Sequence, residues 1–210
     1  MAISIRSGIV LLALTQLMST PSARAAKQEY NFKDPKGVNS ILFILDSVVE
    51  PIMGLAGGVS GTVTFDPLKP KMTSGKIVVA TKSLYIAHRG MKNTVQSAEW
   101  LDAKRHPTIE FTLKKVNESK ILRKGVYELD VTGDISCKGV TKELTTKVTV
   151  TYLPGKLGDR QGGQNGDLLI LRCNFVMKRS DHNIKSGMGS MVVADEIQLR
   201  VSIVGTFKRG

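Results

Sequence analysis

Most of the chain after residue 26 has a period of two, in which apolar residues alternate with polar ones. The segment 108–116 is typical, because it places Ile109, Phe111 and Leu113 on one side of an extended chain. Successive side chains of a strand point to opposite faces, so this pattern predicts half-buried β-strands. A chain of antiparallel strands must bury one face of each strand, which it does in a sandwich or in a closed barrel.

About eight or nine such strands are predicted, with turn residues between them. They span residues 30–32, 40–45, 61–65, 76–85, 108–116, 126–137, 144–152, 168–177 and 197–207. One short helix is predicted at residues 91–102. Val95, Ala98 and Leu101 lie on one face of that helix. The Gly-rich stretch 154–166 is predicted to be a long hairpin loop.

Residues 1–25 are predicted to be a cleavable signal peptide for export, so that the mature chain begins at Ala26. Arg6 supplies a positive charge, and residues 9–18 form an apolar core. Residues 23–25 have the small-residue pattern of a cleavage site. The apolar core is shorter than the roughly 18 residues that a membrane helix needs, although an uncleaved anchor is the alternative. We therefore expect a chain that is periplasmic or secreted.

The formal net charge of +12 favours anionic partners such as lipid head groups or acidic polymers. The basic residues occur as short pairs spread along the chain, such as Lys114-Lys115 and Lys208-Arg209, and solvated strand faces explain them equally well. Cys137 and Cys173 are the two cysteines. An exported chain favours a disulfide between them, but their place on the apolar side of each strand favours buried free thiols.

The residue types that carry catalysis are not arranged in a recognisable motif. The three histidines, His88, His106 and His182, are far apart, and no Cys/His set has zinc-binding spacing. No serine lies in a G-x-S-x-G turn, and no phosphate-binding glycine loop is present. We therefore expect no enzymatic activity, no cofactor and no metal. A hydrolase with a Ser or Asp in the mouth of the barrel is the enzymatic alternative.

Five segments, in order along the chain, resemble the YceI-like family of exported lipid-binding proteins. They are residues 60–67 (SGTVTFDP), 97–111 (SAEWLDAKRHPTIEF), 133–142 (GDISCKGVTK), 179–181 (RSD) and 194–197 (ADEI). The resemblance covers roughly residues 28–206. It implies one lipid-binding barrel domain at residues 26–210, an eight-stranded antiparallel barrel similar to lipocalins. Asn39, Asp46 and His106 depart from the family's pattern, so the resemblance does not identify the ligand.

The resemblance also implies an elongated apolar cavity that takes a long-chain lipid, such as a polyisoprenoid or a fatty-acid derivative. The side chains expected to bind the ligand are Phe43, Phe65, Trp100, Phe111, Leu113, Tyr127, Leu129, Phe175, Met177 and Arg179. For each apolar one, a place in a packed core is the alternative. Lys178, Arg179, Lys185, His88 and Arg89 are candidates to attract an anionic head group. For Arg179, the alternative is a structural ion pair with Asp181 or Asp195.

The expected function is that of an exported, non-catalytic carrier of one long-chain lipid. Burying one methylene contributes about 0.8 kcal/mol, so a long lipid chain can bind without any catalytic group. The alternative is a basic β-module that binds anionic polymers or membrane surfaces through its exterior. Nucleic acid is not an expected partner, because the aromatic motifs of RNA-binding modules are missing. The sequence leaves open whether the chain forms a homodimer.

Overall fold

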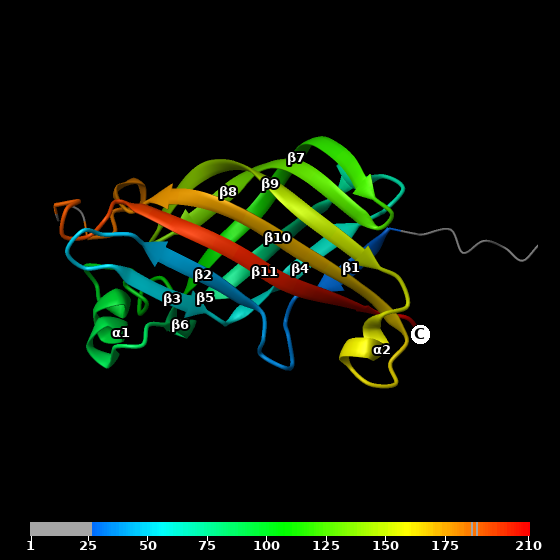
Figure 1. The fold of residues 1–210 in the computed structure, drawn as a ribbon, viewed down its shortest axis with the longest axis horizontal. Coiled ribbons are helices and arrows are strands. Elements are labelled where there is room, and N and C mark those ends of the chain that lie inside the picture. The colour runs from blue at the N-terminus through cyan, green and yellow to red at the C-terminus, as the bar shows by residue number, and fades with distance from the viewer. Residues whose placement is uncertain (1–26, 186, 188) are drawn as a thin grey trace, which may run out of the picture.

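Eleven strands, each antiparallel to its neighbours, form one sheet that closes into a barrel (Figure 1). The strands are β1 (Gln28–Asn31), β2 (Ser40–Leu45), β3 (Ile52–Ala56), β4 (Val59–Phe65), β5 (Ser74–Ala80), β6 (Leu84–Tyr85), β7 (Thr108–Arg123), β8 (Val126–Cys137), β9 (Val140–Leu153), β10 (Gly166–Lys178) and β11 (Glu196–Lys208). This computed structural model describes residues 27–210 except 186 and 188. The predicted signal peptide therefore lies outside the described residues.

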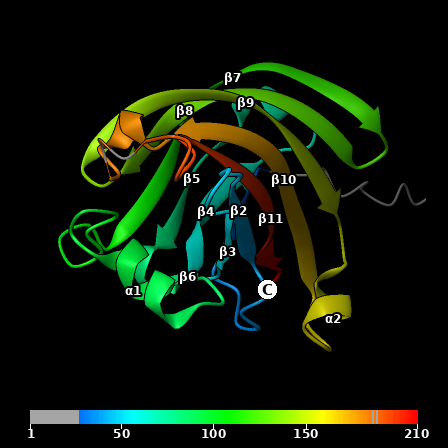
Figure 2. The ribbon, with the colours of Figure 1, turned by 60° about the vertical axis from the view of Figure 1, so that its left-hand side comes forward.

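The helices are short and lie outside the sheet (Figure 2). They are α1 (Arg89–Gln96), α2 (Leu157–Arg160) and the 3-10 turns η1 (Pro70–Met72), η2 (Thr81–Ser83) and η3 (Ser180–His182). α1 lies at one end of the barrel and α2 at the other (Figure 1). In the part of the chain that the structure describes, no helix combines the length and the apolar character that a membrane span requires.

Three of the barrel's eight strands are interrupted, which is why eleven segments fill eight positions in the wall. β1 and β2 lie along the same edge of β11, where Asn31 pairs with Thr206 and Ile41 pairs with Val201. β3 continues into β4, and β5 continues through η2 into β6, which pairs with β3. The pairing of β1 with β11 closes the ring. The predicted eight-stranded antiparallel barrel with one short helix is confirmed.

The structure differs from the predicted elements where a strand breaks or a glycine interrupts the alternation. The predicted strand 76–85 stops at Ala80 and turns through η2. β3 was not predicted, because Gly54 interrupts its apolar pattern; a Cβ atom there would overlap the ring of Phe43 on β2. The predicted helix 91–102 ends at Gln96, and the predicted loop 154–166 contains α2.

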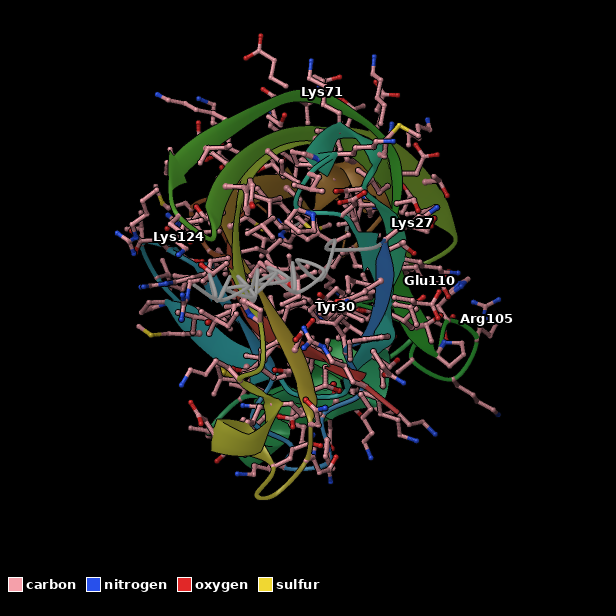
Figure 3. The ribbon with its side chains drawn as sticks, turned by 90° about the vertical axis from the view of Figure 1, so that its right-hand side faces the viewer. Lys27, Tyr30, Lys71, Arg105, Glu110 and Lys124 are labelled. Carbon is pink, nitrogen blue, oxygen red and sulfur yellow. The ribbon has the colours of Figure 1, made fainter. Side chains whose placement is uncertain are left out.

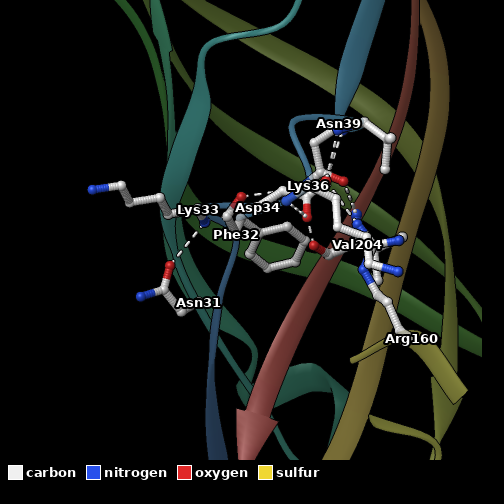
Figure 4. A network of polar contacts seen from close by, with 9 residues as sticks. Asn31, Phe32, Lys33, Asp34, Lys36, Asn39, Arg160 and Val204 are labelled. Atoms are coloured by element: carbon white, nitrogen blue, oxygen red, sulfur yellow. Dashed lines mark hydrogen bonds and ion pairs between the residues drawn. The ribbon is translucent and has the colours of Figure 1, made fainter. Parts of the chain in front are cut away.

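Side chains hold together the break between β1 and β2 (Figure 4). Asn39 donates from Nδ2 to the carbonyls of Phe32 and Val204, each at 3.0 Å, and accepts from the Val204 N–H at 2.8 Å. Asp34 accepts from the Asn39 N–H at 3.1 Å and lies 2.7 Å from the Arg160 guanidinium of α2. The buried amide of Asn39 thus replaces the strand pairing that the break removes.

Asn39→Ala is expected to destabilise the fold by about 2–3 kcal/mol. The side chain is 2% exposed, and its loss leaves two carbonyls and one N–H without partners. Urea unfolding followed by circular dichroism measures the change. Asn31→Ala is the matched control, because Asn31 is exposed and accepts one hydrogen bond, from the Lys33 N–H. Equal losses in the two variants would contradict this role for Asn39.

Aromatic side chains fill the α2 end of the barrel. We call this set, Tyr30, Phe65, Tyr127 and Tyr152, the aromatic plug. The rings of Phe65 and Tyr127 pack edge to face with centroids 5.3 Å apart, and Tyr152 lies 6.2 Å from Phe65. In the view onto this end, Tyr30 lies inside the outline of the barrel, whereas Lys71 and Lys124 lie at its periphery (Figure 3).

The plug is held at its outer side by a buried carboxylate. Asp167 is fully buried and accepts from the Tyr152 hydroxyl at 3.3 Å and from the Gly155 N–H at 2.8 Å. The guanidinium of Arg209 lies 2.7 Å from the same carboxylate. A buried carboxylate needs such partners, because desolvation otherwise disfavours its charged form. This end of the barrel is therefore closed by both packing and polar contacts.

Candidate ligand-binding cavity

An elongated apolar cavity of about 230 Å³ lies inside the barrel. Every second residue from Leu171 on β10 to Arg179, which directly follows the strand, lines it. A strand rises by about 3.3 Å per residue, so the lining follows β10 for roughly 26 Å. Val150 and Ile203 line the cavity toward the plug, and Trp100 lines it toward α1. A small volume spread over this length fits an extended chain better than a compact ligand.

The barrel wall is paired over only part of its length between β9 and β10. The two strands form a ladder from Leu168 paired with Leu153 to Arg172 paired with Thr149. The ladder ends there, although the lining continues past it on both strands, with Thr146 on β9 and the alternate residues of β10. The cavity is thus bordered along this stretch by strands that do not hold each other by backbone hydrogen bonds.

Among the residues that the structure describes, three charged ones border the cavity: Lys76, Glu110 and Arg179. Lys76 and Glu110 form an ion pair with each other across β5 and β7. The hydrogen bond from Lys76 holds the pKa of the Glu110 carboxyl below its usual range. Lys76 and Glu110 alternate along β5 and β7 with the inward-facing Ile77 and Phe111, so this partly exposed pair lies on the outer face of the wall.

Arg179 directly follows β10, before η3, and is 3% exposed. Its guanidinium donates to four carbonyls of the segment that follows. The acceptors are Ala194 (2.8 Å, from Nε), Ile184 (2.8 Å, from Nη1), Lys185 (2.9 Å, from Nη1) and Val193 (3.0 Å, from Nη2). One side chain therefore fixes both ends of the 184–194 segment to the barrel.

The ion pair of Arg179 with Asp181 or Asp195, which the sequence left open, is not formed within the described residues. Asp195 instead accepts from the Ser180 N–H at 2.9 Å and from its hydroxyl at 2.7 Å. Burial alone raises the pKa of Asp195, but these hydrogen bonds and the nearby charge of Arg179 outweigh it and lower the pKa. The carboxylate thus stays charged near the guanidinium.

The lysines at the α1 end of the cavity also have partners. Lys185 forms an ion pair with Glu99, which holds the pKa of that carboxyl below its usual range. Lys138, in the turn between β8 and β9, donates to the carbonyls of Glu99 at 2.8 Å and Asn183 at 2.7 Å. These contacts tie the segment after α1 to the segment after β10, next to the lining residue Trp100.

The profile of the YceI-like domain matches residues 37–205. The chain belongs to the YceI-like family. The match agrees with the family predicted from the five motifs, and it covers the barrel from the end of the β1–β2 break to β11.

Relatives of this YceI-like chain share much of its length. Protein YceI of Escherichia coli O157:H7 is 30% identical over 145 residues, which is 69% of this chain and 69% of that protein. The crystal structure of Burkholderia cenocepacia BcnA is 25% identical, has a TM-score of 0.62, and is matched over 79% of this chain and 95% of its own. A polyisoprenoid binding domain from Saccharophagus degradans has a TM-score of 0.62 at 8% identity, over 88% of this chain and 100% of its own, which shows the fold alone.

Eight of the ten side chains predicted to bind the ligand line the cavity of this YceI-like barrel. They are Phe43, Trp100, Phe111, Leu113, Leu129, Phe175, Met177 and Arg179. The other two, Phe65 and Tyr127, lie in the aromatic plug and pack against each other. Both lie on strands that were predicted. Periodicity along a strand, however, does not show which part of the barrel's length is filled by packed side chains. The ligand-binding role of the eight stays a prediction.

Further lining residues come from β9 and β11, which contributed none to the predicted set. Leu144 and Val148 of β9 and Ile197, Leu199 and Val201 of β11 line the cavity. All five lie on the apolar face of predicted strands. Their alternation with polar residues is the sequence signal that identifies them. The predicted set did not include these aliphatic residues because it favoured aromatic ones.

The structure describes the side chains of two further basic residues that were candidates to attract an anionic head group. Lys178 is exposed and alternates with the lining residues of β10, so it faces away from the cavity. His88 is the N-cap of α1 and accepts from the Met91 N–H at 3.3 Å. Arg89 begins α1, and its side chain lies outside the described part of the structure.

Cys137 and Cys173 are free thiols, and both line the cavity. The structure therefore contains no disulfide between them, and their place on the apolar side of β8 and β10 explains their presence. Burial raises the pKa of the Cys137 thiol to about 12 and that of the Cys173 thiol to about 11. Both thiols are protonated at neutral pH, so they contribute uncharged surface to the cavity.

Alkylation of the folded chain by N-ethylmaleimide is expected to be about a hundredfold slower at pH 8 than alkylation of the unfolded chain. The thiolate reacts, and a thiol with a pKa of about 11 is rarely ionised at that pH, whereas an unfolded cysteine has a pKa near ~8.5. Mass spectrometry of Cys173 peptides, measured from pH 7 to pH 11, gives the rates. A rate that levels off near pH 9 would contradict the raised pKa.

Proposed function

We propose that the protein is an exported, non-catalytic carrier that holds one long-chain lipid, a polyisoprenoid or a fatty-acid derivative, inside the barrel. The observation that carries the proposal is the apolar lining that follows β10 for its length from Leu171 to Arg179. Family membership supports it, as does the shared fold with a domain described as polyisoprenoid binding. The sequence of residues 1–25 supports export.

Hydrophobic burial alone supplies the binding free energy that such a carrier needs. At about 0.8 kcal/mol per methylene, a chain of ~15 carbons gains on the order of 10 kcal/mol before the entropic cost of ordering it. The cavity offers apolar surface on every side, from β2, β7, β8, β9, β10 and β11. No covalent step is required.

Ion pairs on the outer surface favour the interpretation that its basic residues belong to solvated strand faces, and not to a binding patch for anionic polymers. Three lysines on the outer faces, Lys76, Lys114 and Lys147, pair with carboxylates of nearby strands, which balances the charge at those positions. Examples are Lys114 with Asp134 at 2.7 Å and Glu143 at 3.2 Å, and Lys147 with Glu128 at 3.6 Å. Such exposed pairs contribute little to stability but they do reduce the field available to a polyanion.

Extraction of the purified protein tests the proposed function. The full chain is produced in a bacterium that exports it, purified without detergent and extracted with organic solvent. Mass spectrometry is expected to find one long-chain lipid at close to one molecule per chain. An empty extract, together with no uptake of an added C20 isoprenoid alcohol by the same preparation, would overturn the proposal.

A further inference from the structure

The outer face of the barrel is apolar at β2, β3 and β6, three neighbouring strands that lie next to α1 (Figure 1). Phe43 of β2, Ala56 of β3 and Leu84 of β6 line the cavity, so the residues that alternate with them point outward. These outward residues are apolar as well. We call them the apolar face: Leu42, Ile44, Met53, Leu55 and Tyr85.

The five side chains of the apolar face form one continuous surface. Leu55 pairs across the sheet with Leu42 and with Tyr85, and Met53 pairs with Ile44. Paired residues of neighbouring strands point to the same side, and their side chains lie within contact distance. Met53 is 61% exposed and Tyr85 is 57% exposed. Contiguous apolar surface that is open to solvent marks a site of contact with a protein or a membrane.

Elsewhere the fold covers apolar residues of its own outer face. Near α2, Leu168 and Ile170 of β10 point outward, and Leu157 of α2 packs on them. All three side chains are buried. In the part of the chain that the structure describes, no element covers the apolar face in this way, because Met53 and Leu55 stay exposed. The apolar face is therefore open to a partner.

Basic residues border the apolar face. Arg200 of β11 is exposed and pairs in the sheet with Leu42, and Lys92 of α1 lies beside Tyr85. Lys82 belongs to η2, which packs next to β3. Among the described residues, none of these three cations forms an ion pair. Unlike the three paired lysines on the outer faces of β5, β7 and β9, they are available to an external anion.

The charge of the chain favours an anionic partner over a second copy of the chain. Three carboxylates lie near the apolar face, those of Asp46, Glu50 and Glu196, at the end where β2 turns into β3. They do not offset the excess of basic residues, since the formal net charge of +12 falls only to +10 without Arg6 and Arg24. Two copies of the chain repel each other at long range, whereas an anionic surface attracts each of them.

We propose that the apolar face docks the protein on the surface of an anionic lipid bilayer. Met53 and Leu55 enter the boundary between head groups and acyl chains, and Tyr85 lies at this interface, which favours aromatic side chains with a polar end. Arg200 and Lys92 contact anionic head groups. The outer face of a barrel is convex, so few side chains enter the bilayer and the attachment is reversible. The inference does not depend on what the cavity holds.

Sedimentation with lipid vesicles tests the docking. The purified full chain is mixed with vesicles of one part phosphatidylglycerol to three parts phosphatidylethanolamine, or with vesicles of phosphatidylcholine alone. Binding to the anionic vesicles is expected to be about tenfold tighter and to weaken as salt is added, because salt screens the attraction between basic residues and anionic head groups. Equal binding to the two kinds of vesicle, or binding to neither, would overturn the proposal.

Met53→Glu tests whether the apolar face is the surface that binds. The variant places a carboxylate where an apolar side chain enters the bilayer, so binding to the anionic vesicles is expected to fall at least about tenfold. Met72→Glu is the matched control, because Met72 lies in η1, which packs next to β7, and is 67% exposed. An equal loss in both variants would overturn the assignment of the face. Light scattering that finds a dimeric parent chain and a monomeric Met53→Glu variant would identify a second copy as the occupant and overturn the proposal.

Extraction of the same proteins distinguishes the docking from the carrier function. Met53 points away from the cavity, so Met53→Glu is expected to keep the lipid content of the parent chain while it loses vesicle binding. A parent chain whose extract is empty but which still binds anionic vesicles would overturn the carrier function and support the docking.

Discussion

Cys173→Trp is expected to reduce the lipid that co-purifies with the chain by at least about tenfold, because the indole would occupy the space that the ligand needs. Cys173 lies near the middle of the lining of β10, and it pairs across the sheet with Val201, which also lines the cavity. A cavity of about 230 Å³ that is long and thin is blocked by one large ring at its centre. The ring enters existing space, so folding should be largely preserved.

The matched control for this variant is Asn174→Trp, which places the same side chain one residue further along β10. Asn174 is exposed and points to the outer face, because successive residues of a strand alternate. Quantitative extraction of both variants and of the parent chain gives the lipid content, and thermal unfolding shows that each is folded. Equal lipid contents in the two tryptophan variants would place the ligand outside the barrel.

The sequence predicted the strands well because their main signal is local, whereas the choice of a barrel over a sandwich came from the family resemblance. Alternation along each strand identifies the inward face without any knowledge of the partner strands, and it correctly places Phe111, Leu129 and Phe175 on the cavity. The interruptions of the wall are less visible. β3 forms because Gly54 makes room for the Phe43 ring on the neighbouring strand, and this is a contact between strands that no periodicity within β3 reveals.

The polar part of the site depends on contacts between residues that are not adjacent in any pattern. A positive residue after an alternating strand was expected to meet a head group or a nearby aspartate. Arg179 instead meets the backbone carbonyls of Ile184, Val193 and two neighbouring residues, which become acceptors only once the 184–194 segment has folded over it. Backbone groups are the same at every position of a sequence, so such a partner leaves no signal in it.

Arg179→Met is expected to lower the free energy of unfolding by about 3–5 kcal/mol, a loss on the order of 10 °C in melting temperature for a domain of this size. Methionine fills similar apolar space but donates no hydrogen bond. Four carbonyls then lose their donor, two of them in buried bonds, those of Ile184 and Val193. Part of the cost is recovered as the 184–194 segment opens to water, which is why the estimate lies below four full penalties.

Two companion variants distinguish geometry from charge in this prediction. Arg179→Lys keeps the positive charge but has one nitrogen, which cannot reach carbonyls at both ends of the segment, so it should lose nearly as much stability as Arg179→Met. Lys178→Met removes a charge from the exposed neighbour and should change stability by less than about 0.5 kcal/mol. Chemical unfolding measures all three. If Arg179→Lys kept the parent stability, the charge near Asp195 would matter and the four hydrogen bonds would not. The expected result makes the planar guanidinium the element that closes the α1 end of the barrel.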